Sequence, residues 1–146
     1  MLETAILYSS LLIAQTQKPT QQFVELRNQL QNYGFEVVIK LPPKRGAYGL
    51  FRVKDKKIWI NPVVFDLNIA NPVLIHESVH AAQFCAGKGK MQALNLNIQP
   101  IRPARRLFLR YSNIHRQELE REAYAVQTQP NRFELAKNLL KKHCKK

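Results

Sequence analysis

The segment from residue 72 to residue 85 is apolar around almost its whole circumference, and this feature constrains the fold most strongly. Asn71 precedes it as an N-cap, Pro72 suits its first helical position, and Gly87 and Gly89 follow it. Its apolar residues are Val73, Leu74, Ile75, Val79, Ala81, Ala82 and Phe84. A helix that is apolar on all sides must be covered on all sides, so we expect it to run through the middle of a domain.

The segments around this helix predict an α+β domain. Apolar residues at helical spacing between residues 20 and 33 indicate an amphipathic helix that ends at Gly34. Residues 35–39 predict a strand, and the apolar runs 48–53 and 58–60 predict a hairpin. Helical periodicity returns at residues 106–111, 117–127 and 133–142. A small sheet with several helices packed around it follows from this order of elements.

No repeat or low-complexity linker divides the chain of 146 residues, so we expect a single domain over residues 1–146. Three parts lie outside its predicted regular core. They are an N-terminal segment (1–18), an irregular basic excursion (88–105) interrupted by prolines, and a basic tail (141–146).

His76 and His80 lie within the apolar helix, four residues apart, with Glu77 next to the first of them. On a helix this spacing directs both imidazoles to one side, where they can share a metal ion. The neighbouring carboxylate can then take a proton from a metal-bound water without being a ligand itself. A buried hydrogen-bonded cluster of the same three side chains, without a metal, is the competing interpretation.

A catalytic zinc ion usually takes three protein ligands, and the segment 117–127 offers three carboxylates for the third position. Its apolar stripe consists of Leu119, Ala123 and Val126. Glu122 lies nearest to that stripe, so we expect it to point inward and to bind the metal. We expect Glu118 and Glu120 to form a solvated acidic face with Arg121.

Residues 74–80 (Leu-Ile-His-Glu-Ser-Val-His) together with residues 121–123 (Arg-Glu-Ala) resemble the gluzincin metallopeptidases, particularly their small single-domain members. The resemblance implies a minimal zincin-like domain, with a small antiparallel sheet or hairpin packed on the motif helix. It implies one zinc ion per chain, held by His76, His80 and Glu122, and Glu77 as the general base for hydrolysis of a peptide bond. The chain departs from the metzincin branch, because Gly87 and Gly89 are not followed by the third histidine that this branch would need.

The resemblance also implies an edge strand that binds an extended protein or peptide substrate by backbone pairing, either residues 49–53 or residues 57–60. A second donor to the oxyanion is commonly a tyrosine or histidine in such enzymes. His115, Tyr111 and Tyr124 are the candidates here.

The formal net charge of +13 favours contact with polyanions or acidic substrates. No Asp or Glu occurs from Ser78 to Gln117, and a possible anion-binding set lies in that stretch: Arg102, Arg105, Arg106 and Arg110. Binding to nucleic acid is therefore one alternative function, although no signature of a known nucleic-acid-binding motif accompanies the charge. A catalytically silent zinc-binding module that holds a peptide or partner is another. The oligomeric state stays open.

Cys85 and Cys144 could pair if the end of the chain folds back, yet so low a cysteine count also fits a reducing compartment. Residues 5–14 have about the length of a signal-peptide apolar region, but no Lys or Arg precedes them. We therefore expect a cytoplasmic protein, and no run of apolar residues is long enough to predict a membrane span.

Overall fold

The computed structural model describes residues 17–145 and has an α+β fold. The helices in this part of the chain are α1 (Gln21–Asn32), α2 (Val63–Asp66), α3 (Ala70–Ala86), α4 (Arg105–Leu109), α5 (Ile114–Gln127) and α6 (Arg132–Cys144). The strands are β1 (Glu36–Ile39), β2 (Gly49–Arg52) and β3 (Lys57–Ile60), and two short 3-10 helices are η1 (Val53–Asp55) and η2 (Arg102–Ala104). Residues 5–14, which were compared above with a signal-peptide apolar region, lie outside the described residues.

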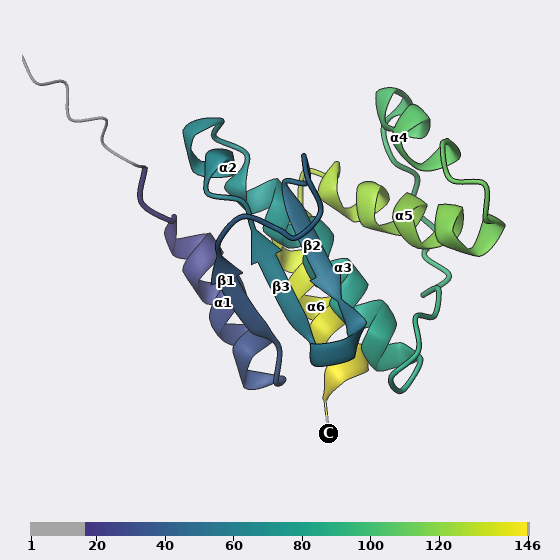
Figure 1. Cartoon of the computed structure of the whole chain (residues 1–146). Coiled ribbons are helices and arrows are strands. Elements are labelled where there is room, and N and C mark those ends of the chain that lie inside the picture. Colours follow the sequence, from purple (N-terminus) through teal and green to yellow (C-terminus); the bar gives the residue numbers. More distant parts are fainter. Residues whose placement is uncertain (1–16, 146) are drawn as a thin grey trace, which may run out of the picture.

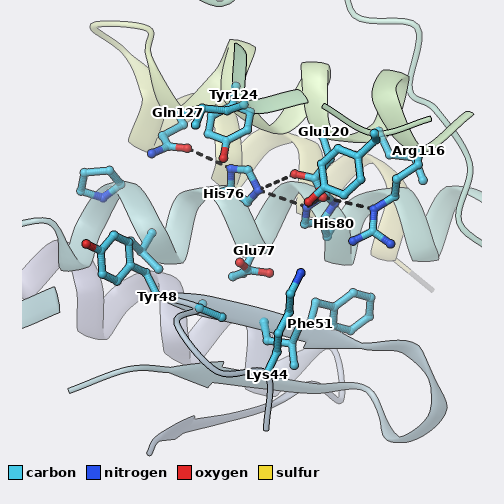
Figure 2. Close-up of a pocket in the computed structure, with 18 of the residues that line it drawn as sticks. Lys44, Tyr48, Phe51, His76, Glu77, His80, Arg116, Glu120, Tyr124 and Gln127 are labelled. Atoms are coloured by element: carbon cyan, nitrogen blue, oxygen red, sulfur yellow. Dashed lines mark hydrogen bonds and ion pairs between the residues drawn. The ribbon is translucent and has the colours of Figure 1, made fainter. Parts of the chain in front are cut away.

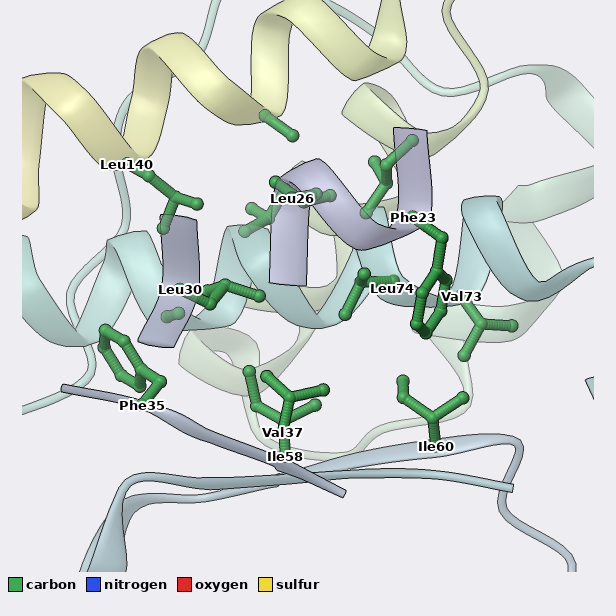
Figure 3. Close-up of a cluster of buried hydrophobic side chains, with 14 of the residues drawn as sticks. Phe23, Leu26, Leu30, Phe35, Val37, Ile58, Ile60, Val73, Leu74 and Leu140 are labelled. Atoms are coloured by element: carbon green, nitrogen blue, oxygen red, sulfur yellow. The ribbon is translucent and has the colours of Figure 1, made fainter. Parts of the chain in front are cut away.

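The motif-bearing helix α3 is the centre of the fold, as predicted from its apolar circumference. Figure 1 shows α3 and α6 behind the sheet, with α1 to one side and α4 and α5 to the other. The core in Figure 3 joins side chains of α1, α3 and α6 with those of β1 and β3. The fully buried ones include Phe23, Leu26, Leu30, Ile58, Ile60, Leu74 and Leu140. Side chains of this size each contribute roughly 1.5–3 kcal/mol when they leave water.

The start of α3 differs from the predicted boundary. The first helical hydrogen bond runs from the Val73 N–H to the Ile69 carbonyl (3.1 Å), so Ile69 is the capping residue and Asn71 is already inside the helix. Pro72 is tolerated there because the N–H groups of a first helical turn have no partner within the helix. Asn71 instead accepts a hydrogen bond from the Thr20 hydroxyl (2.9 Å), and Thr20 caps α1.

The three strands form a mixed sheet in the order β1-β3-β2. The predicted hairpin is present, since β2 and β3 pair antiparallel, but β1 runs parallel to β3. The sheet is therefore not purely antiparallel. Because β3 pairs on both sides, the expectation that residues 57–60 could be an edge strand is wrong, whereas β2 lies at an edge and contacts α3.

Residues 91–101 have no regular structure, as expected for the excursion between residues 88 and 105. Cys85 and Cys144 form a disulfide that joins the end of α3 to the end of α6. The first four residues of the predicted basic tail, 141–144, belong to α6. Among the described helices, none has the length and apolar character needed to cross a membrane.

Candidate metal centre

Three side chains bring ligand atoms together where α3 crosses α5 (Figure 2). His80 Nε2 lies 3.2 Å from His76 Nε2. The two Glu120 oxygens lie 3.1 Å from His76 Nε2 and 3.3 Å from His80 Nε2. All the ligand atoms of His76, His80 and Glu120 fall within 4.8 Å of one another. The separations of 3.1–3.3 Å are compatible with ligands around one ion, since ligands about 2.0–2.3 Å from a zinc ion lie within about 4.6 Å of one another.

Gln83 fixes which nitrogen of His80 carries the proton. The Gln83 amide nitrogen donates to the Leu119 carbonyl (2.9 Å) and to Glu122 Oε1 (3.1 Å), so the amide oxygen is the atom that faces His80. His80 Nδ1 lies 2.9 Å from that oxygen. An amide oxygen only accepts hydrogen bonds, so Nδ1–H donates and Nε2 is left with a lone pair in the neutral ring.

His76 is held in the same way from the other side. Its Nδ1 lies 2.9 Å from Gln127 Oε1, to which it donates. The Tyr124 ring packs against the imidazole with ring centroids 4.6 Å apart. Two Nε2 lone pairs and one carboxylate therefore converge, and such a set of acceptors needs a cation or an added proton between them. Histidine ligands of metals are held by outer partners in this manner.

The same groups shift one another's pKa values. Burial by itself would lower the pKa of His80, but Glu120 and Glu77 beside it raise the pKa to about 9. Burial by itself would raise the pKa of Glu120, whereas the two imidazoles hold it well below its usual range. The cluster therefore has a strong preference for one additional positive charge.

Glu77 lies next to the two histidines, on the side of α3 that faces β2 (Figure 2). Its side chain is buried, and burial raises its pKa against the opposing effect of the two histidines. An added Cβ at Gly49 would lie 2.7 Å from Glu77 Oε1 and 2.8 Å from Val73 Cγ1. Glycine at this position thus lets the edge strand approach the carboxylate closely.

The expectation that Glu122 joins the histidine pair is wrong. Glu122 is fully buried and points inward as predicted, but toward the irregular excursion. Its carboxylate accepts hydrogen bonds from the backbone N–H groups of Leu94 (2.7 Å) and Leu96 (3.0 Å), and from the Gln83 amide. Its role in the structure is to fasten residues 91–101 to α5.

The expectation that Glu120 lies in a solvated acidic face is also wrong, because the motif histidines cover it and leave its side chain only 7% exposed. The apolar stripe on α5 identified the core-facing side but not the side that faces α3. A second, polar stripe marks that side: Glu120, Tyr124 and Gln127 follow one another at spacings of four and three residues. Glu118 agrees with its predicted role, since it pairs at 2.7 Å with Arg121 and is 40% exposed.

A cavity of about 1180 Å³ opens over the cluster, between the β2 side of the sheet and α5. Glu77, Tyr111 and Tyr124 line it. Burial raises the pKa of Tyr124 to about 12, so its hydroxyl stays protonated and able to donate. His115 is not among the lining residues, because it is exposed and its Nε2–H donates to the Met91 carbonyl at 3.1 Å. Of the three candidate oxyanion donors, the structure brings the two tyrosines to the cavity.

The predicted anion-binding arginines are divided by the structure. Arg110 lines the cavity, whereas Arg102, Arg105 and Arg106 are exposed on η2 and α4 outside it. Sequence reasoning did not identify Gln83 and Gln127 as partners of the histidines. It also missed the cavity cations that come from other segments, which are Lys44, Arg45 and Arg132, whereas Arg116 belongs to the acid-free stretch from Ser78 to Gln117.

A family described as a domain of unknown function (DUF8637) matches residues 36–145. This range contains the sheet, the motif helix and all three residues of the candidate metal centre. No curated protein and no solved structure matches the chain.

Proposed function

Since the chain belongs to this family of unknown function, we propose from its own residues that it is a zinc-dependent metallopeptidase. The observation that carries the proposal is the convergence of three acceptors, His76 Nε2, His80 Nε2 and Glu120, beside a buried carboxylate and a large cavity. Two histidines and one glutamate suit zinc better than magnesium or calcium, which prefer oxygen ligands. Three protein ligands leave a position for water, as catalytic zinc sites do and structural ones do not.

Each nearby group has a role in this chemistry. A zinc ion bound here would polarise a peptide carbonyl and make water acidic enough to attack it near neutral pH. Glu77 would accept the proton of that water, and its burial favours the protonated form that would arise during the reaction. Tyr124 and Tyr111 are candidates to donate a hydrogen bond to the oxygen that becomes negative.

The arrangement of the sheet suits a peptide substrate and supports the zincin-like interpretation. Within residues 17–145, β2 pairs with β3 alone, so its other edge is available for backbone hydrogen bonds with an extended chain. Gly49 in this strand lies against Glu77, and residues 44–51 form one wall of the cavity. A peptide paired along β2 would therefore pass over the general base and the metal centre.

The test is hydrolysis of an unbiased peptide mixture by the zinc-loaded protein, compared with Glu77→Gln. The variant keeps all three ligands, so we expect unchanged zinc content and a loss of roughly 10²–10⁴-fold in rate, the usual contribution of a general base. Glu118→Gln is the matched control, because that carboxylate is partly exposed and pairs with Arg121 away from the metal centre.

Three results would be informative. Hydrolysis that is lost only in Glu77→Gln supports the proposal. Equal hydrolysis by Glu77→Gln and the parent would show that another group, or a contaminant, cleaves the peptides. A zinc-loaded parent that cleaves nothing in the mixture would favour the alternative of a silent zinc-binding module.

A further inference from the structure

The wall of the cavity carries more positive than negative side chains. Five cationic residues line it: Lys44, Arg45, Arg110, Arg116 and Arg132. The lining carboxylates are Glu77 and Glu120, and both lie at the metal centre. A bound divalent zinc ion would offset these two charges, so the outer part of the cavity would keep an excess of positive charge.

The cations come from both sides of the cavity. Lys44 and Arg45 belong to the loop that leads into β2, whereas Arg110 and Arg116 lie at the end of α4 and in α5. Figure 2 shows Lys44 pointing into the cavity from the sheet side and Arg116 from the α5 side. A substrate in the cavity would therefore meet positive charge on two opposite walls.

Two of these side chains are held in place by an aromatic ring. The Arg110 guanidinium lies 5.3 Å from the centre of the Tyr111 ring, and that of Arg116 lies 5.0 Å from it. Such stacking restricts the side chains before a substrate arrives. It also leaves their N–H groups available for carboxylate oxygens.

The positive charges are largely without acidic partners. Within residues 17–145, no carboxylate forms an ion pair with Lys44, Arg45, Arg110 or Arg132, and Arg116 is 3.5 Å from Glu120. Unpaired charges of one sign in a concave site concentrate the electrostatic field there and attract ligands of the opposite sign.

From this geometry we propose that the cavity selects peptides with Asp or Glu side chains on both sides of the bond to be cleaved. The inference rests on the proposed peptidase function and adds the class of substrate. The cations on the β2 wall would bind acidic side chains of an extended peptide that point to that wall. The cations near α4 and α5 would bind the acidic side chains that point to the opposite wall.

The test measures peptide binding, so it does not depend on turnover. Three labelled peptides of equal length carry Glu, Gln or Lys around a common centre, and fluorescence anisotropy gives their Kd with zinc-loaded Glu77→Gln protein. We expect the Glu peptide to bind at least about tenfold more tightly than the Lys peptide at low salt, and the difference to shrink at high salt. Lys44→Glu and Arg110→Glu should each weaken binding of the Glu peptide by about fivefold or more.

Lys141→Glu is the matched control, because it makes the same charge reversal on an exposed part of α6 outside the cavity. It should bind the Glu peptide as the parent does. Equal affinity for the three peptides would overturn the proposal. So would a single-stranded DNA oligonucleotide that binds in a Lys44-dependent way while the Glu peptide does not, since the cavity would then serve nucleic acid.

Hydrolysis by the parent protein separates this proposal from the one on which it rests. Cleavage of the three peptides with equal kcat/KM would leave the peptidase function standing and contradict the preference for acidic substrates. Tight, charge-dependent binding of the Glu peptide without cleavage by the parent would contradict the peptidase function and leave the preference for acidic peptides standing.

Discussion

Replacing Glu122 with glutamine should unfold the protein at a markedly lower temperature without removing the metal. The fully buried carboxylate accepts three hydrogen bonds, from Leu94 N–H, Leu96 N–H and the Gln83 amide. Glutamine replaces one of the two accepting oxygens with a donor, so at least one buried N–H loses its partner, at a cost of about 1–3 kcal/mol. The bonds that remain lose the strength that a charged acceptor gives them.

Together these effects amount to a loss of about 3 kcal/mol in the free energy of unfolding. For a domain of this size, such a loss lowers Tm by about 6–12 °C. Scanning calorimetry of the parent and Glu122→Gln proteins measures the shift, and elemental analysis of the same samples should give equal zinc contents. Glu118→Gln is again the control, with a shift close to zero because surface pairs contribute little. An unchanged Tm together with lost zinc would show instead that Glu122 binds the metal and does not fasten residues 91–101.

Three further changes probe other parts of the structure. Gly49→Ala adds a Cβ 2.7 Å from Glu77 Oε1, so kcat/KM should fall about tenfold or more at unchanged zinc content. Full activity of this variant would mean that the position of the Glu77 carboxylate does not matter for hydrolysis. Leu140→Ala removes a fully buried side chain and should lower the free energy of unfolding, measured by urea denaturation, by about 2–5 kcal/mol. A smaller loss would contradict the place of Leu140 in the core. Cys144→Ser removes the disulfide to Cys85, which lies 59 positions earlier in the sequence, and should lower the free energy of unfolding by about 4 kcal/mol in the same assay. Equal stability of the variant and the parent would argue that the bond does not form.

Local patterns predicted most of the elements because each has a strong signal of its own. The apolar circumference of residues 72–85 predicted that α3 lies at the centre, and the spacing of Phe23, Leu26 and Leu30 predicted the helix α1. The parallel pairing of β1 with β3 depends on contacts between distant segments, for which the sequence has no local signal. The four-residue helix α2 was missed because one turn is too short to show periodicity.

The candidate site was predicted in part for a similar reason. The positions of His76, Glu77 and His80 follow from helical geometry within one element. The third ligand depends on which side of α5 faces α3, and an apolar stripe shows only which side faces the core. Glu122 satisfied that criterion, but it faces residues 94–96, while the rotation of α5 turns Glu120 to the histidines.

The charge of the proposed substrate was likewise predicted only in part. The sequence showed a strong positive charge and suggested the arginines at 102–110 as its centre. Folding moves most of that stretch to the outer surface and brings in Lys44 and Arg45 from about 60 residues earlier. Charge composition thus indicated the sign of the partner, but only the fold indicates which cations share the cavity.

The proposal that His76, His80 and Glu120 hold one zinc ion is tested by the zinc content of the purified, zinc-supplied and dialysed protein, measured by elemental mass spectrometry. We expect about one zinc per chain in the parent and in Glu118→Ala, and almost none in Glu120→Ala, because loss of one of three ligands greatly weakens binding. Zinc-free parent protein, or a Glu120→Ala protein that retains its zinc, would contradict the proposed metal centre.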